Sequence, residues 1–352
     1  MSSRYPVASY SRVSCYNRCA YQHYLRYEVG VRPRTTADYL RKGVLVHAGL
    51  EAAIREECSG KDDQGLTPSP YSVLRACEHG VQASYDKWAE KNQDLLANNS
   101  AFEQESLQVM LDAVSIAKRT VQHLGIDVGR WETKRDENGN PLVEYKLYAA
   151  APTKGWQGFV AYLDWVATDK ESGYTWLLDF KTRKAFQNEE HEETNLQSML
   201  YQYLLSRELG LDLEGTCTVQ IRSKPVGEPK VTQKGKLSRA ANQNTDWPTY
   251  RNTVVARGEN PDDYLDVAEK LPVFHQETYT YRPYDQCHRA WEETKLTLNL
   301  MSELVVWPRS LSTYNCQGCG EKEYCLADLR GDDPQDLLGT LYTIRDRKKT
   351  QK

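Results

Sequence analysis

The sequence lacks any apolar run of the roughly 18 residues that a membrane-spanning helix requires, which argues against an integral membrane protein. Its first residues also lack the apolar core of a secretory signal, so we expect a cytoplasmic protein in a reducing compartment. It contains no internal repeat and no long low-complexity segment. No Walker A motif is present, because Gly235-Lys236 is followed by leucine and lacks the preceding glycine, so we expect no ATP-driven motor.

The charge of the chain is nearly balanced, with a formal net charge of −4 at pH 7 over 352 residues. This sum neither suggests nor excludes nucleic-acid binding, because local patches of charge matter more than the total. One basic patch contains six cations against a single acid, Glu228. The six cations are Arg222, Lys224, Lys230, Lys234, Lys236 and Arg239. Such a patch indicates either a nucleic-acid contact or a solvated loop.

Hydrophobic periodicity predicts an α/β chain of alternating helical and extended segments. We expect helices over residues 9–29, 37–57, 71–96, 102–124, 194–209 and 283–304. We expect strands over residues 142–150, 158–168, 174–182 and 215–222, and a long loop or hairpin over residues 223–246. The length suggests two or three domains, or one elaborated domain.

Two of these strands are separated only by a short polar stretch, which predicts a β-hairpin. A turn centred between Glu171 and Ser172 places Asp164 directly opposite Asp179, with Cβ atoms about 5 Å apart. Lys181 shares the face of Asp179, because side chains two residues apart lie on the same side of a strand. Two carboxylates this close repel each other unless a divalent cation lies between them. The hairpin therefore predicts a metal-dependent phosphodiester-cleaving site, and the alternative is two surface carboxylates beside a solvated lysine.

Three cysteines near the C-terminus, Cys316, Cys319 and Cys325, follow a C-x2-C-x5-C spacing. Closely spaced thiolates with an intervening glycine can wrap a metal ion or cluster, because glycine lets the loop turn sharply. A fourth ligand must come from elsewhere, and Cys15 and Cys19, one helical turn apart, are the candidates. Four thiolates suit an iron–sulfur cluster or zinc, and the alternative is a set of buried free thiols.

Three further residues have an ordinary structural explanation when they are considered alone. His47 lies in an apolar helical segment, where a single histidine is more often a packed core residue than a metal ligand. Gln197 and Tyr201 lie one turn apart in a predicted helix, where a surface glutamine and a core tyrosine are the simpler interpretation.

The order of these motifs resembles the RecB-like branch of the PD-(D/E)XK nuclease superfamily. In particular, it is similar to the iron–sulfur exonucleases related to CRISPR-associated and AddB-type nucleases, including phage-encoded relatives. The family pattern opens with Ser-x-Ser-Arg and Tyr-x-x-Cys-Pro, which residues 9–12 and 16–19 match, although Ala20 replaces the proline. The later motifs match at Gly43 and His47, at Asp164 (with Ala161 in place of a glycine), at Asp179 and Lys181, at Gln197 and Tyr201, and at Cys316, Cys319 and Cys325.

This resemblance implies a restriction-endonuclease-like α/β core, in which helices flank a mixed central sheet. It also implies a helical N-terminal insertion and a four-cysteine iron–sulfur element that joins both chain ends. The implied division is an N-terminal part of the iron–sulfur element at 1–35, a helical region with His47 at 36–128, the nuclease core at 129–305, and the C-terminal iron–sulfur element with a basic tail at 306–352.

The resemblance also implies roles for the individual residues. Mg²⁺ or Mn²⁺ would be held by His47, Asp164, Asp179 and the carbonyl oxygen of Phe180. Lys181 would orient a water molecule or stabilise developing negative charge. The nucleic-acid strand or the nucleophile would be positioned by Gln197 and Tyr201. A 4Fe–4S cluster would be bound by Cys19, Cys316, Cys319 and Cys325.

We therefore expect a metal-dependent DNA exonuclease that acts on single strands or duplex ends in phage or bacterial recombination, replication or DNA processing. The basic patch would follow the phosphate backbone of the DNA. The alternative is a non-catalytic or partner-dependent nucleic-acid-binding subunit with a structural metal site of four cysteines, working with a helicase, recombinase or integrase. The intact set of Asp164, Asp179 and Lys181 favours the enzyme, and no membrane partner is expected.

Overall fold

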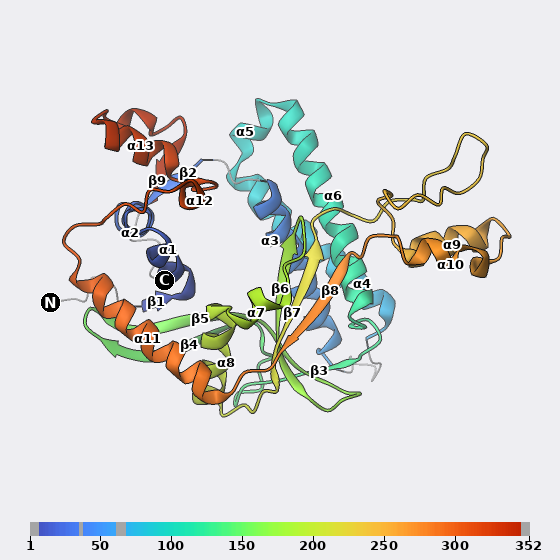
Figure 1. Ribbon diagram of the computed structural model, residues 1–352, viewed down its shortest axis with the longest axis horizontal. Helices are drawn as coiled ribbons and strands as arrows, with labels where there is room; N and C mark the ends of the chain where they lie inside the picture. Colours follow the sequence, from blue (N-terminus) through green and yellow to red (C-terminus); the bar gives the residue numbers. More distant parts are fainter. Residues whose placement is uncertain (1–6, 35–37, 61–67, 346–352) are drawn as a thin grey trace.

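A mixed β-sheet lies between two layers of helices at the centre of the fold (Figure 1). The computed structural model describes residues 7–34, 38–60 and 68–345. The strands of the sheet are β1 (Val7–Ser9), β3 (Trp131–Thr133), β4 (Val143–Thr153), β5 (Trp156–Asp169), β6 (Thr175–Arg183), β7 (Gly215–Arg222) and β8 (His275–Thr280). Their order is β1-β5-β6-β7-β8, and β3 and β4 also pair with β5. The β1–β5 and β6–β7 pairs are parallel and the others antiparallel, which confirms the predicted mixed central sheet.

In the described part of the chain, each face of the sheet is covered by a layer of helices that shares an apolar cluster with the strands. The first layer comprises α3 (Asp38–Glu57), α4 (Pro70–Lys91) and α6 (Ser100–His123). The second layer comprises α1 (Tyr10–Arg18), α8 (Leu196–Leu209) and α11 (Tyr284–Glu303). Leu178 and Phe180 of β6 pack into the first layer, whereas Leu177 packs into the second. This strand is therefore apolar on both faces, because consecutive side chains point to opposite sides of a sheet.

The β5–β6 hairpin has the register that the sequence predicts. Trp165 pairs with Leu178 in the last antiparallel pair before the end of the ladder. The same register places Asp164 opposite Asp179, one position beyond that pair. The Phe180 backbone N–H donates a hydrogen bond of 2.7 Å to Asp164 Oδ2, which ties the two strands together at this level.

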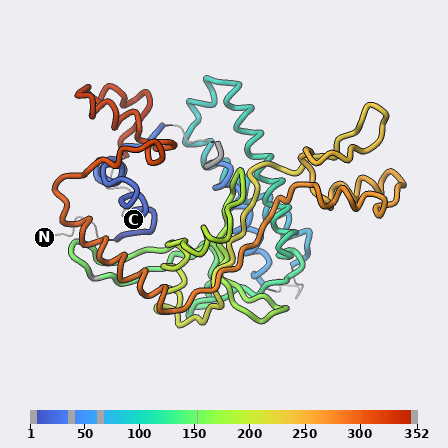
Figure 2. Tube along the Cα trace, in the orientation of Figure 1, coloured from blue at the N-terminus to red at the C-terminus, as the bar shows by residue number. Residues whose placement is uncertain are grey.

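Segments near the two ends of the described chain lie side by side, as the blue and red parts of the tube show (Figure 2). The strands β2 (Val31–Pro33) and β9 (Tyr342–Ile344) form a separate two-stranded sheet. The buried carboxylate of Glu321 accepts hydrogen bonds from Gln22 at 2.7 Å and Arg26 at 2.8 Å. The C-terminal part also contains α12 (Thr313–Cys316), α13 (Lys322–Arg330) and the 3-10 helix η3 (Pro334–Leu337). The predicted basic tail, beyond its first residue, lies outside the described residues.

The helix predicted over residues 9–29 is wrong as a continuous element, because it breaks at Cys19. This residue has an extended backbone (φ −161°, ψ 110°) between α1 and the next helical turn. The Tyr21 N–H, just after the break, donates to the Pro308 carbonyl at 3.0 Å. The continuation consists of α2 (Ala20–His23) and the π-helix η1 (Tyr24–Val29). A contact with a segment almost 300 residues away along the chain therefore accompanies the break, and local periodicity does not indicate it.

The helix predicted over residues 71–96 also breaks, at Asn92 between α4 and α5 (Gln93–Ala97). The Asn92 side chain donates to the Trp88 carbonyl at 2.7 Å and so occupies the acceptor that a continuing helix would use. The other predicted helices correspond to α3, α6, α8 and α11, with small differences at their ends, and a short helix α7 (Glu189–Glu193) precedes α8. The four predicted strands correspond to β4, β5, β6 and β7. The pattern does not predict β1, β3 and β8, which have only 3, 3 and 6 residues.

Residues 223–274 form an insertion between β7 and β8 that projects from the sheet, on the right in Figure 1. The predicted loop over residues 223–246 is confirmed, since it contains only an isolated bridge between Val231 and Leu237. The rest of the insertion contains α9 (Trp247–Ala256), the 3-10 helix η2 (Pro261–Tyr264) and α10 (Leu265–Ala268). These elements pack around an apolar cluster of their own. No helix among the described residues is both long and apolar enough to cross a membrane.

Candidate active site

The end of β6 carries a buried carboxylate beside an ammonium group. Lys181 Nζ donates to Asp179 Oδ1 at 2.7 Å, and the Asp179 side chain is only 8% exposed. Burial raises the pKa of Asp179, the Lys181 ammonium opposes this shift, and the nearby Asp164 carboxylate adds to it. The second carboxylate oxygen, Oδ2, is buried without a hydrogen-bond partner in the described part of the chain. A buried carboxylate oxygen without a partner is costly, so this atom is suited to a cation.

His47 approaches the same place from helix α3. Its Nε2 lies 2.9 Å from the Phe180 carbonyl oxygen, and its Nδ1 lies 3.8 Å from Asp164 Oδ2. Burial lowers the pKa of His47, but the carboxylates of Asp164 and Glu144 outweigh this effect and raise the pKa to about 9. The His47 imidazole therefore lies beside Asp164 and Phe180, two of the residues with which the resemblance groups it as a metal ligand.

The site contains one carboxylate that the sequence analysis missed, Glu144 of β4. Its Oε1 lies 3.5 Å from His47 Nδ1. One ligand atom each of His47, Glu144 and Asp164 lie within 4.8 Å of one another. No motif marks this residue, because β4 reaches the site only by pairing with β5. The one signal in the sequence is a charge directly after two apolar residues, Leu142 and Val143, at the start of a strand.

Glu144 also has an unusual backbone. Its φ is 44°, and it is the one non-glycine residue with a positive φ among those that the structure describes. Pairing of its neighbours with β5 places it opposite Asp164. In a regular strand the residues on either side would share a face, but Val143 packs into the first helix layer and Tyr145 against the second. The side chains of β4 therefore change from one face of the sheet to the other at Glu144. A strained backbone of this kind is typical of functional positions.

These groups form a donor set that fits a divalent cation. Carboxylates and a backbone carbonyl are the oxygen ligands that Mg²⁺ and Mn²⁺ bind, and an imidazole is acceptable to Mn²⁺. The buried Oδ2 of Asp179, which has no hydrogen-bond partner in the described part of the chain, supports this fit. An open cleft of about 530 Å³, lined by His47, Glu144 and Lys181 among others, leads from this place to the solvent. The structure thus contains a candidate metal site with an accessible mouth.

Gln197 and Tyr201 of α8 complete the predicted set. Tyr201 is buried, which raises its pKa to about 12, although the Tyr162 backbone and the Gln197 side chain oppose this shift. It is near enough to contribute to the electrostatic environment of Lys181. The tyrosine therefore stays protonated at neutral pH beside the Lys181 ammonium.

Four cysteines from both ends of the chain line one pocket. They are Cys19, Cys316, Cys319 and Cys325. Cys15, the other candidate for the fourth position, does not line the pocket and is buried, which raises the pKa of its thiol to about 11. Among the described residues, no three cysteine sulfurs lie within 4.8 Å of one another.

The structure does not bring the six cations of the basic patch together. Arg222 and Lys224 line a cavity beside α6 and α9. Lys230 and Arg239 make contacts within the insertion, to a backbone carbonyl and to Asp266 respectively. The other two cations are exposed near the tip of the insertion loop.

Comparison with known proteins identifies the family to which this arrangement belongs. A search of curated proteins finds no significant match. Residues 7–325 match the PD-(D/E)XK nuclease superfamily, a span that contains the central sheet, the β5–β6 hairpin and the cysteine motif. Since the match extends over nearly all of the sequence, the chain belongs to the PD-(D/E)XK nuclease superfamily, which implies a metal-dependent nuclease.

Proposed function

We propose that this protein is a metal-dependent DNA exonuclease. The observation that carries the proposal is the convergence of Asp164, Asp179 and Lys181 at the end of one hairpin, in a chain of a nuclease superfamily. His47 and the Phe180 carbonyl oxygen, 2.9 Å apart, would supply further ligands for Mg²⁺ or Mn²⁺. An imidazole among oxygen ligands favours Mn²⁺ relative to a site made only of oxygen atoms.

The residues around the metal position have separable roles. A bound cation would acidify a water molecule and neutralise charge on the phosphoryl oxygens. Asp179 holds the Lys181 ammonium in place, so Lys181 can orient the attacking water or stabilise the charge that develops on the phosphate. A fixed donor of this kind is worth on the order of 3 kcal/mol in the transition state. The Phe180 N–H holds the Asp164 carboxylate, so this ligand needs little reorganisation to bind.

Tyr201 and Gln197 are proposed to position the nucleic-acid strand. The tyrosine hydroxyl stays protonated, and Gln197 is near enough to affect its pKa. Exonucleolytic mode and a setting in phage or bacterial recombination, replication or DNA processing rest on the order of motifs, from the N-terminal Ser-x-Ser-Arg pattern to the cysteines.

We also propose that a 4Fe–4S cluster joins the two ends of the chain. Its support is the common pocket of Cys19, Cys316, Cys319 and Cys325, which brings cysteines from both ends of the chain together. Because the cysteines come from opposite ends of the sequence, the cluster would close a very long loop and remove much entropy from the unfolded chain. The free energy of cluster binding would then become free energy of folding.

The test is cleavage of end-labelled linear DNA, single- and double-stranded, by protein purified without oxygen. Reactions contain Mg²⁺, Mn²⁺ or EDTA, and compare wild type with Asp179→Asn and with Glu171→Gln, which removes a carboxylate at the exposed turn of the same hairpin. We expect shortening from the ends with wild type and Glu171→Gln, and none with EDTA or Asp179→Asn.

Two outcomes contradict the proposal. Wild-type rates in Asp179→Asn would show that the hairpin is not the active site. Absence of cleavage by wild-type protein with a full cluster would favour the partner-dependent or non-catalytic binding protein instead.

A further inference from the structure

A second cavity, of about 590 Å³, lies where the insertion meets α6 and the ends of strands β7 and β8. One wall is formed by α6 and by the start of β8, and the opposite wall by α9 of the insertion. The floor is the end of β7 and the residues that follow it. The cavity exists only because the insertion folds back against the core.

The charged side chains of this cavity are mainly cationic. Arg119, Arg222 and Lys224 face a single acid, Glu228. Arg119 is neutralised by an ion pair with Asp246, which caps α9. The other two cations have no ion pair within the described residues, so the cavity keeps a positive excess. Hydroxyl and amide groups of α9 provide further hydrogen-bonding positions, from Thr249, Asn252 and Thr253.

Arg222 is held ready for a ligand. Its guanidinium lies 5.4 Å from the Phe186 ring centroid and 5.8 Å from that of Phe274. Its backbone N–H also donates to the Phe274 carbonyl at 3.0 Å. Its Nε is buried and has no hydrogen-bond partner among the described residues. A cation fixed between two rings with an unused buried donor is suited to an anion, and a guanidinium fits the geometry of a phosphate.

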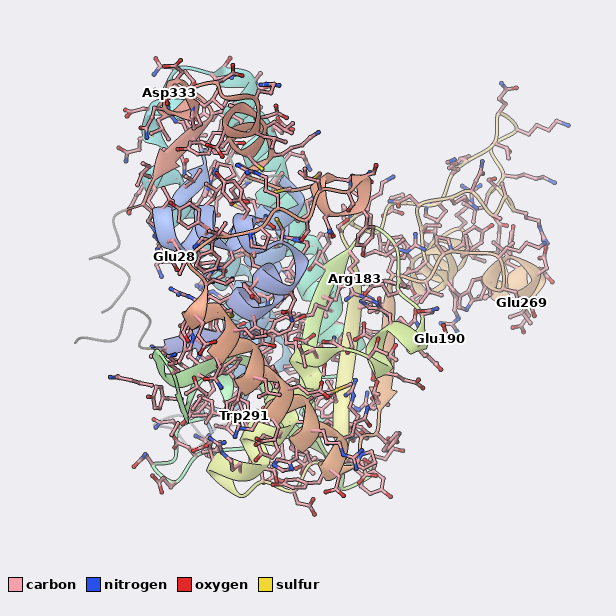
Figure 3. The ribbon with its side chains drawn as sticks, turned by 60° about the vertical axis from the view of Figure 1, so that its left-hand side comes forward. Glu28, Arg183, Glu190, Glu269, Trp291 and Asp333 are labelled. Atoms are coloured by element: carbon pink, nitrogen blue, oxygen red, sulfur yellow. The ribbon has the colours of Figure 1, made fainter. Side chains whose placement is uncertain are left out.

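The cavity is aligned with the candidate active site through the parallel pair β6–β7. Asp179 pairs with Thr218, whereas Arg183 pairs with Arg222 four residues further along. At about 3.3 Å per residue, Arg222 lies about 13 Å beyond the level of Asp179 along the strands. Arg183 lines the active-site cleft, and in Figure 3 it lies between the segment that carries Glu28 and the insertion that carries Glu269. The active-site cleft and this cavity therefore lie near the same end of the neighbouring strands β6 and β7.

We propose that this cavity binds a backbone phosphate of the substrate strand, at a position separate from the phosphate that is cleaved. The inference rests on the proposed nuclease function and adds a strand-holding role for the insertion. Arg222 and Lys224 are the phosphate ligands, and the hydroxyl groups of α9 lie on the facing wall. Of the six cations in the basic patch, these two line the cavity and would bind the phosphate there.

The test measures binding of a labelled single-stranded oligonucleotide, as a function of salt, in EDTA. The parent protein is the full chain with Asp179→Asn, which prevents cleavage. The cavity variant adds Arg222→Gln and Lys224→Gln. The matched control adds Lys87→Gln and Lys154→Gln, which removes two exposed charges outside the cavity.

We expect the slope of log K against log salt to become shallower by about 0.7 for each phosphate that the cavity no longer neutralises, and the control to retain the parent slope. Lys224→Gln alone changes an exposed side chain and should show a smaller shift of the same sign without any effect on folding. Slopes and affinities equal to those of the parent in both cavity variants would overturn the inference. Binding of inorganic phosphate by the cavity, with unchanged DNA binding, would overturn it too.

This result is independent of the cleavage assay. A wild-type protein that cleaves DNA, with cavity variants that bind normally, refutes the phosphate site and leaves the nuclease standing. A wild-type protein that does not cleave, with cavity variants that bind weakly, refutes the nuclease and retains the phosphate site.

Discussion

The strained glutamate of β4 allows a prediction in which stability and metal binding change in opposite directions. Glu144 has a φ of 44°, and its carboxylate lies 3.5 Å from His47. Asparagine adopts positive φ more easily than glutamate, so Glu144→Asn should relieve backbone strain and also remove the carboxylate. Glu144→Gln removes only the charge and keeps the strain.

The expected magnitudes follow from these two effects. A left-handed backbone costs about 1–2 kcal/mol for an ordinary residue, so Glu144→Asn should raise metal-free stability by about 1 kcal/mol. In a chain of this size such a gain raises the melting temperature by about 1 °C. Loss of even an indirect partner of a metal ligand weakens metal binding about 10- to 100-fold, so both variants should bind Mn²⁺ at least tenfold more weakly. At a hundred times the wild-type Kd, Mn²⁺ stabilises wild type by about 2.7 kcal/mol and a tenfold weaker variant by about 1.4 kcal/mol.

The assay compares thermal unfolding with and without Mn²⁺, and the Mn²⁺ concentration that gives half-maximal cleavage. The control is Glu137→Gln, an exposed carboxylate in the connection between β3 and β4. The melting temperature should increase in Glu144→Asn without metal, while the Mn²⁺-induced increase becomes smaller in both Glu144 variants. An unchanged Mn²⁺ dependence in both variants would refute the conclusion that Glu144 belongs to the metal site.

Three further predictions address the ammonium group, the cysteines and a buried histidine. Lys181→Met should fold normally and cleave about 100-fold more slowly in single-turnover assays, because one fixed donor is removed; cleavage at the wild-type rate would contradict its role. Cys319→Ala should give colourless, poorly soluble protein while Cys58→Ala stays brown, as visible absorbance would report, and a brown, stable Cys319→Ala would exclude the cluster assignment. Burial, with His123 and Arg119, lowers the pKa of His275 to about 3. Because the unfolded value is about 6.5, this histidine contributes stability that is present above pH 6.5 and is lost as the pH falls, by about 2 kcal/mol at pH 5. The melting temperature of wild type should therefore fall more steeply between pH 6.5 and 5 than that of His275→Gln, and parallel curves would argue against this origin.

Sequence-based prediction succeeds here where one local pattern decides the structure. The β5–β6 register follows from alternation and a short turn, so the opposition of Asp164 and Asp179 can be predicted without knowledge of the rest of the chain. The long helices of both layers follow from apolar periodicity, although their ends do not. The prediction is wrong at Asn92, where a side chain takes the helical acceptor, and at Cys19, where the helix breaks beside a contact with Pro308.

The sequence by itself determined the hairpin, its pair of aspartates and the cysteine spacing, because these depend on residues that are close along the chain. Only the tertiary structure decided that Glu144 lies beside His47, since strand pairing and helix packing bring together residues about 100 positions apart. It also decided which of Cys15 and Cys19 lines the pocket with the C-terminal cysteines, because the break at Cys19 accompanies contacts between the chain ends. The six cations of the basic patch are likewise separated in space because of how the insertion folds against α6. The pattern of charge along the sequence does not indicate this.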